Sequence, residues 1–156
     1  MAKRGGCDFS QLKHLQEKLN YLHGGDFNKF CESVAKELAS RLLAKVIKRT
    51  PVGQYKDGSG KVGGNLRRGW TGEQQSNAKS YADSLPIVKK GGVFEVEIIN
   101  PVHYASYVEY GHRTRNHKGW VKGQFMLTIS EKELETQAPK IIENKLIQFL
   151  AENLQK

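Results

Sequence analysis

Residues 93–111 constrain the fold more than any other stretch of this chain. The first part is rich in β-branched and aromatic residues, and Phe94, Val96 and Ile98 alternate with glutamates. This alternation predicts a strand with one buried face and one solvated face, as in an antiparallel sheet covered by helices on one side. Pro101 ends the strand. The tyrosine-rich segment that follows fits either a short helical turn or a continuation of the sheet.

The neighbouring segments extend this strand into a sheet. Gly91-Gly92 separates residues 93–99 from the strand-like residues 86–90, and such a two-residue glycine turn predicts a β-hairpin. Residues 65–70 predict a further strand or a turn, and residues 124–129 predict a short final strand. Residues 71–84 are polar and show no clear period.

Three segments have the apolar spacing of amphipathic helices. Residues 8–22 form the first, with Phe9, Leu12, Leu15, Leu19 and Leu22 on one face. Residues 26–49 form the longest, with an apolar stripe made of Phe27, Phe30, Cys31, Val34, Ala35, Leu38, Leu42, Val46 and Ile47. A C-terminal helix follows the capping-box pattern of Ser130 and Glu133 and runs to Leu154. Pro139 is expected to kink it or to delay its start.

These segments together predict an α+β fold. We expect an antiparallel β-sheet of about three to four strands, packed against the long helix of the N-terminal half and against the C-terminal helix. The chain has 156 residues, the size of one domain. Residues 1–7 are expected to be a mobile basic tail. Residues 8–156 are expected to form the single domain, with exposed loops at about 51–64 and 111–123.

The positive charge of the chain is concentrated in two regions. The net charge is +9; residues 45–68 carry seven cations and one acid, and residues 113–122 carry four cations and no acid. Such clusters favour contact with phosphate backbones or with acidic protein surfaces. No apolar run is long enough to span a membrane, and we expect no membrane contact. The two cysteines are too few for a disulfide framework, which favours a reducing compartment.

Nothing in the sequence indicates an active site, and we expect neither an enzyme nor a cofactor. The histidines near Glu109 match no metal-binding motif, so no catalytic or metal-ligating residue is assigned. The glycine-rich stretch 53–64 lacks the ending of a phosphate-binding loop. Cys31 lies on an apolar stripe, and a buried, unreactive thiol is expected there.

Two residues have predicted local roles. Trp70 is expected to pack over the end of the core. Glu109 is expected either to fix the turn in which it lies or to pair with a cation such as Arg67 or Arg68.

Three sequence motifs, in order after the long helix, resemble one known family. They are Thr50-Pro-Val-Gly, then Gly64-Asn-Leu-Arg-Arg-Gly-Trp, then Pro101-Val-His-Tyr-Ala-Ser-Tyr-Val-Glu-Tyr-Gly. This order is similar to that of the tail-completion (head–tail joining, minor tail) proteins of tailed bacteriophages and prophages. The resemblance covers residues 26–154. It departs from the family where Gly63-Gly64 replaces Thr-Gly and where Gln124-Phe125 replaces Pro-Phe.

The resemblance implies a structural virion protein at the neck of a phage or prophage tail, which completes the tail or joins it to the head through ring assembly. It implies as partners neighbouring copies of the protein and other neck or tail proteins, namely the connector, the tail terminator or the tail tube. DNA in the lumen of the ring is a further expected contact. The implied location is the virion, and the host cytoplasm during assembly.

Charge and the predicted loops select the residues expected at the interfaces. They are Lys56, Lys61, Arg67, Arg68, Trp70, Tyr104, Tyr107, Glu109, Arg113, Arg115, Lys118, Trp120 and Lys122. Two other classes of protein remain as alternatives. A basic nucleic-acid-binding domain would bind DNA as a monomer, with an affinity that depends strongly on salt. A small hydrolase or metalloprotein would need a bound metal or a measurable turnover.

Overall fold

The structure is a computed structural model, and it describes residues 25–72 and 77–154. The predicted tail 1–7 and the predicted helix 8–22 lie outside the described residues. The described part contains both helices and antiparallel strands, which confirms the expected α+β class.

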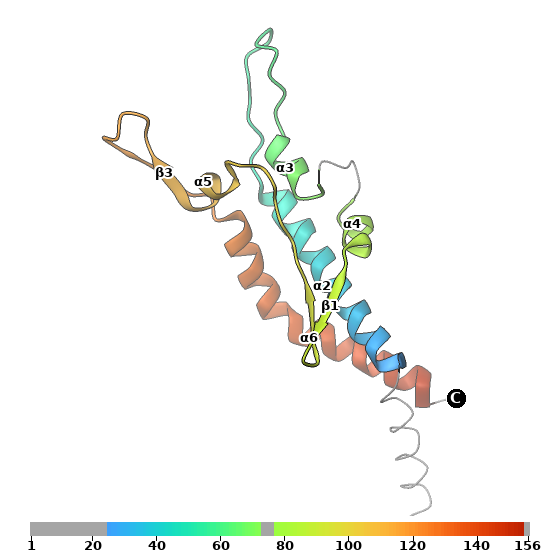
Figure 1. Ribbon diagram of the computed structural model, residues 1–156. Coiled ribbons are helices and arrows are strands. Elements are labelled where there is room, and N and C mark those ends of the chain that lie inside the picture. The colour runs from blue at the N-terminus through green and yellow to red at the C-terminus, as the bar shows by residue number, and fades with distance from the viewer. Residues whose placement is uncertain (1–24, 73–76, 155–156) are drawn as a thin grey trace, which may run out of the picture.

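Two long helices form the frame of the molecule (Figure 1). Helix α2 spans Gly25–Arg49 and helix α6 spans Met126–Leu154. They run antiparallel, because Phe30 near the start of α2 stacks on Phe149 near the end of α6, with ring centroids 4.7 Å apart. At the other end, Arg49 contacts Glu133. The helix predicted for residues 26–49 is therefore confirmed.

The start of α6 differs from the expectation. Residues 126–129, predicted as part of a strand, form the first turn of this helix, and Pro139 lies inside the helix without ending it. Ser130 is fully buried within the helix, where its hydroxyl donates to the carbonyl of Met126 at 2.6 Å. Ser130 and Glu133 therefore do not form the predicted capping box.

Three short helices lie where periodicity gave little guidance. They are α3 (Asn65–Gly69), α4 (Ala78–Ser84) and α5 (Ala105–Tyr110). Each has fewer than two full turns, so an apolar stripe cannot develop. A local side-chain cap marks the start of α4, where the side chain of Asn77 accepts from the backbone N–H of Ser80 at 2.8 Å. Helix α3 replaces the strand or turn expected at residues 65–70.

The strands form two separate hairpins rather than one sheet of three to four strands. Strand β1 (Ile87–Lys90) pairs antiparallel with β2 (Val93–Val96), with Ile87 opposite Val96, as the turn at Gly91-Gly92 predicted. Strand β3 (Gly111–Arg113) pairs with β4 (Trp120–Lys122) within the region predicted as an open loop. Helix α5 lies between the two hairpins in the chain. The tyrosine-rich segment is therefore a short helix and not a continuation of the sheet.

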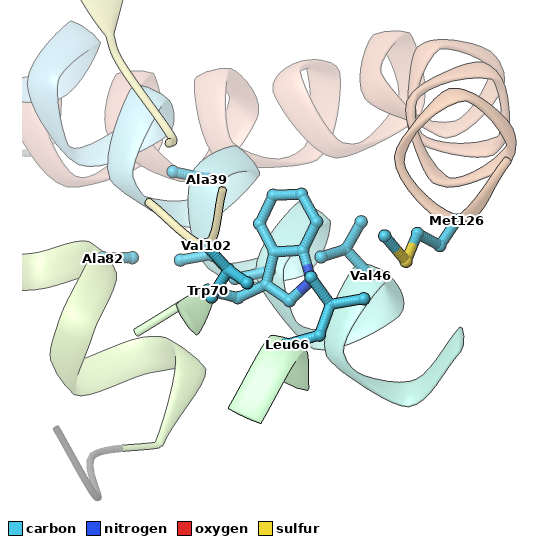
Figure 2. Close-up of a cluster of buried hydrophobic side chains, with 8 residues drawn as sticks. Ala39, Val46, Leu66, Trp70, Ala82, Val102 and Met126 are labelled. Atoms are coloured by element: carbon cyan, nitrogen blue, oxygen red, sulfur yellow. The ribbon is translucent and has the colours of Figure 1, made fainter. Parts of the chain in front are cut away.

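The core lies where α2, α3, α4 and the start of α6 meet. Figure 2 shows the indole of Trp70 among Val46, Leu66 and Val102. The side chain is only 3% exposed, which confirms its predicted packing in the core. Ala39 and Leu43 are also buried in this cluster, although neither belongs to the predicted stripe of the long helix. The stripe residues nearer the start of α2 lie mainly on a different, more open face.

Candidate functional site

Glu109 lies in α5, and its side chain connects this helix to the start of α6. Its side chain is 5% exposed. One carboxylate oxygen accepts from the backbone N–H of Leu127 at 2.9 Å, and the other accepts from the backbone N–H and the hydroxyl of Thr128 at 2.9 and 2.7 Å. The first N–H groups of a helix have no partner within the helix, so this carboxylate acts as a cap supplied from a distant segment. Neither Arg67 nor Arg68 pairs with Glu109, and that part of the prediction is wrong.

The backbone around Glu109 also anchors the β3–β4 hairpin. The carbonyl of Val108 accepts from the N–H of Gln124 at 2.8 Å, and the carbonyl of Glu109 accepts from the N–H of Phe125 at 3.0 Å. Gly111 begins β3 with a φ of +88°. A side chain there would collide with the carbonyl oxygen of Val121 across the hairpin. The Tyr-Val-Glu-Tyr-Gly motif thus builds the base from which the hairpin projects.

The second motif holds the end of α2 against α3. The indole N–H of Trp70 donates to the hydroxyl of Thr50 at 2.8 Å, and that hydroxyl donates to the carbonyl of Val46 at 2.7 Å. The guanidinium of Arg67 donates twice to the carbonyl of Thr50, at 2.7 and 3.2 Å. Arg68 donates to the carbonyl of Gly63 at 3.2 Å. These contacts close the base of the loop at residues 51–64.

The two basic segments project from the same end of the molecule, away from its C-terminus (Figure 1). The loop 51–64 is exposed along most of its length and carries Lys56 and Lys61. The ammonium of Lys61 lies 5.9 Å from the ring centroid of Tyr55, which is 52% exposed. The β3–β4 hairpin carries the exposed cations Arg113, Arg115, Lys118 and Lys122. None of these six cations forms an ion pair with a residue that the structure describes.

The predicted interface residues therefore fall into two groups. The six cations named above, Arg68, Tyr107 and Trp120 are exposed. Trp70 and Glu109 are buried in the fold, Tyr104 packs against the core, and Arg67 is half-buried on the carbonyl of Thr50. The side chains of Trp70 and Glu109 form hydrogen bonds inside the fold, at the bases of the two projecting segments.

Exposed aromatic side chains lie in the hairpin that carries these cations and in the segments on either side of it. We define the aromatic–basic surface as Tyr107, Tyr110, Trp120, Val121 and Phe125 together with Arg113, Arg115, Lys118 and Lys122. Tyr107, Tyr110 and Trp120 are 57, 61 and 62% exposed. Three of its members, namely Tyr110, Val121 and Phe125, were missed by the sequence reasoning. Their exposure depends on how α5 and the hairpin sit on α6, which no local pattern encodes.

The described residues offer little for catalysis. Within residues 25–72 and 77–154, no group of three or more His, Cys, Asp or Glu side chains could hold a metal ion. His103 lies edge-on to Tyr104, and His112 lies 5.8 Å from the ring of Tyr107. Cys31 is free and half-buried on an apolar surface. None of the helices that the structure describes has the length and apolar character needed to cross a membrane.

The lone titratable group with a clear perturbation among the described residues is structural. Glu133 of α6 pairs with Lys45 of α2 at 2.9 Å and with Arg49. The hydrogen bond from Lys45, followed by the hydrogen bond and charge of Arg49, holds the pKa of the Glu133 carboxyl below its ordinary value, although desolvation opposes the shift. Arg49 also donates to the hydroxyl of Ser130 at 3.0 Å. This network joins the two long helices below the projecting segments.

Comparison with known proteins identifies the class. A family model described as "Bacteriophage HK97-gp10, putative tail-component" matches residues 13–111, which is more than half of the chain. All three motifs lie inside this match, which starts earlier than the resemblance seen in the sequence and ends at Gly111. No curated protein and no solved structure matches the chain significantly.

The fold and the exposed surface fit an assembly protein, and the chain belongs to the HK97-gp10-like family of phage tail components. This confirms the family expected from the sequence motifs. It supports a structural protein of the tail, located in the virion and in contact with other tail proteins. Residues 112–156, including most of the hairpin and all of α6, lie outside the matched range.

Proposed function

We propose that this protein is a structural subunit of the tail neck that completes the tail or joins it to the head by assembling into a ring. The aromatic–basic surface is the single observation that carries the proposal. It provides the contact with a neighbouring subunit or with a connector, tail terminator or tail tube protein. Assembly, and not catalysis, is the function of the subunit in this proposal.

The composition of this surface supports binding to a protein. Aromatic residues and arginine are enriched at protein interfaces, and buried aromatic side chains often supply most of the binding energy. Tyr110 and Trp120 are the most exposed aromatic side chains of the surface, at 61 and 62%. Their exposure in an isolated subunit leaves a large apolar area in contact with water, which a partner would cover.

The basic segments add an electrostatic component. Lys56 and Lys61 on the loop and Arg113 and Lys122 on the hairpin project from one end of the subunit. In a ring, one of these segments can face the lumen, where positive charge would favour DNA passing through the neck. The same charge also suits an acidic patch on a tail partner.

The first experiment is the mass of the purified protein in solution, measured by light scattering at several concentrations and at low and physiological salt. We expect a mass that is a multiple of that of the subunit and ring-shaped particles by electron microscopy. The double variant Trp120→Ala with Tyr110→Ala should have the mass of a single subunit. Ile147→Ala, which truncates a side chain of similar exposure on α6, should leave it unchanged.

Addition of short duplex DNA separates this proposal from the alternative of a nucleic-acid-binding domain. A monomer at every concentration that binds DNA in the nanomolar range, with an affinity that falls steeply with salt, would make DNA binding the primary function. Arg113→Glu with Lys122→Glu would then remove the binding. Lys132→Glu with Lys140→Glu, two exposed positions on α6, changes the net charge by the same amount and would serve as the control.

A further inference from the structure

One face of the β1–β2 hairpin is apolar and open to solvent. Side chains alternate along this segment, and those of Phe94, Val96 and Ile98 point toward α2. We define the outer face of the hairpin by the side chains on the opposite side, namely Val88, Val93, Glu95, Glu97 and Ile99. Its three apolar members are 46, 59 and 58% exposed, in chain order. The solvated face of an antiparallel hairpin usually carries polar residues instead.

The two glutamates give this outer face a negative charge. Glu95 is exposed and pairs with Lys90 of β1 at 3.7 Å. Glu97 is also exposed, and it forms no ion pair with any residue that the structure describes. Residues 91–112 contain no lysine or arginine, so no cation close to Glu97 in the sequence offsets its charge. The outer face therefore combines apolar side chains with an unbalanced negative charge.

The β3–β4 hairpin has a face of the complementary character. Arg113 lies opposite Trp120 in the antiparallel register, and Lys122 is two residues beyond Trp120 on the same strand. These three side chains therefore share one face of the hairpin, and all three are exposed. Residues 110–130 contain no aspartate or glutamate. This face thus combines a large aromatic side chain with two cations.

The two faces are separate within one subunit. The turn of the β1–β2 hairpin points toward the end of the molecule where the C-terminus lies, whereas the β3–β4 hairpin projects from the other end (Figure 1). No ion pair joins the two hairpins within the described part of the chain. A head-to-tail contact between identical subunits requires two different surfaces that complement each other. These two faces meet that requirement.

We propose that the face formed by Arg113, Trp120 and Lys122 packs on the outer face of the β1–β2 hairpin of a neighbouring copy. Trp120 covers the exposed apolar side chains of that face, and the two cations lie against Glu97. Burial of the aromatic side chain supplies affinity, and the charges select the orientation. This inference rests on the proposed assembly of copies of the subunit, and it names the contact through which they assemble.

A second copy suits this face better than DNA does. Phosphates would pair with Arg113 and Lys122, but they would leave the exposed indole of Trp120 without an apolar partner. The outer face of the β1–β2 hairpin offers both an apolar area and a carboxylate. It would itself repel DNA through Glu97.

Reversal of charge, followed by its rescue, tests the contact. Glu97→Lys or Lys122→Glu alone should raise the concentration at which half of the subunits are assembled about fivefold or more, because like charges then face each other. Glu97→Lys combined with Lys122→Glu restores an opposite pair and should return that concentration to within about twofold of the unmodified value. Glu143→Lys, at an exposed position on α6, is the control and should change little. Light scattering measures assembly, and circular dichroism checks that each variant is folded.

A second measurement needs no substitution. An equal mixture of isotopically labelled and unlabelled protein is treated with a carbodiimide, which joins a lysine to a carboxylate in direct contact. Mass spectrometry should find the peptide of Lys122 joined to the peptide of Glu97, with one labelled and one unlabelled partner. The same two peptides joined only with matching labels would place the contact within one chain and would overturn the inference.

The results separate this contact from ring assembly. Assembly that survives both single charge reversals, without the mixed-label product, overturns the contact and leaves the ring intact. A two-subunit particle that shows the rescue supports the contact and overturns the ring. A monomer at every concentration, without the mixed-label product, overturns both.

Discussion

The carboxylate of Glu109 accepts hydrogen bonds from both the backbone N–H and the hydroxyl of Thr128, at 2.9 and 2.7 Å. These residues belong to two different helices, and Glu109 lies in the motif that resembles phage tail proteins. The motif residue thus fixes the start of α6 under the projecting hairpin. These contacts hold α5 against the first turn of α6.

Replacing Glu109 should weaken this cap. Glu109→Gln keeps the shape of the side chain but loses the charge and one acceptor, so a backbone N–H of α6 loses its partner. We expect a loss of about 1–2 kcal/mol in the free energy of unfolding, measured by urea denaturation. Glu143→Gln, on an exposed position of α6, is the control and should change little. Equal stability of the two variants would contradict the capping role.

The hydrogen bond between Trp70 and Thr50 should contribute to the free energy of unfolding. Thr50→Val removes the buried acceptor of the indole N–H and should cost about 1–3 kcal/mol, because the donor stays buried without a partner. Trp70→Phe removes the donor, so the double variant should cost less than the sum of the two single variants. Urea unfolding followed by circular dichroism measures all three. Strictly additive costs would show that this bond contributes nothing of its own.

Gly111 should tolerate no side chain. Alanine at Gly111 would have to adopt a φ of +88°, and its Cβ would collide with the carbonyl oxygen of Val121. The matched control is Gly58→Ala, whose φ of +82° is similar but whose Cβ would meet no atom within 4 Å. Both should lose about 1–2 kcal/mol from the backbone, and Gly111→Ala about 1–3 kcal/mol more from the collision. Indistinguishable losses, by urea denaturation, would contradict the close approach of β3 and β4.

The ion pairs of Glu133 should make stability depend on pH. The pKa of Glu133 is lower in the folded state than its ordinary value of 4.5, so the unfolded chain binds the proton more readily. The contribution of these ion pairs is therefore complete above about pH 4.5 and is lost as the pH falls through the lower, folded-state pKa.

Unfolding by urea at a series of pH values checks this prediction. Glu133→Gln should flatten the decrease in stability below pH 4.5. Glu135→Gln, an exposed neighbour on the same helix, should follow the unmodified protein. If the unmodified protein and Glu133→Gln lose stability in parallel on acidification, the ion pairs with Lys45 and Arg49 are not formed in solution.

Local patterns were sufficient for the elements that carry their own signal. The 25 residues of α2 have enough turns for an apolar stripe, and Gly91-Gly92 marks the β1–β2 hairpin without help from the rest of the chain. The motifs that end at Trp70 and at Gly111 identified the family for a similar reason, because they are short and contiguous. In each case the deciding interactions lie within a few residues of one another along the sequence.

Tertiary contacts decided the remainder. Ser130 and Glu133 have the spacing of a helix start, but the carboxylate of Glu109 moves that start to Met126 and leaves Glu133 to pair with α2. Tyr110 and Phe125 are exposed, and Trp70 is buried, because of how α5, α6 and α3 pack, although all three are aromatic. The sequence alone determined the class of the protein and its long elements. Which side chains face a partner depended on contacts between residues far apart in the chain, and only the folded structure brings those together.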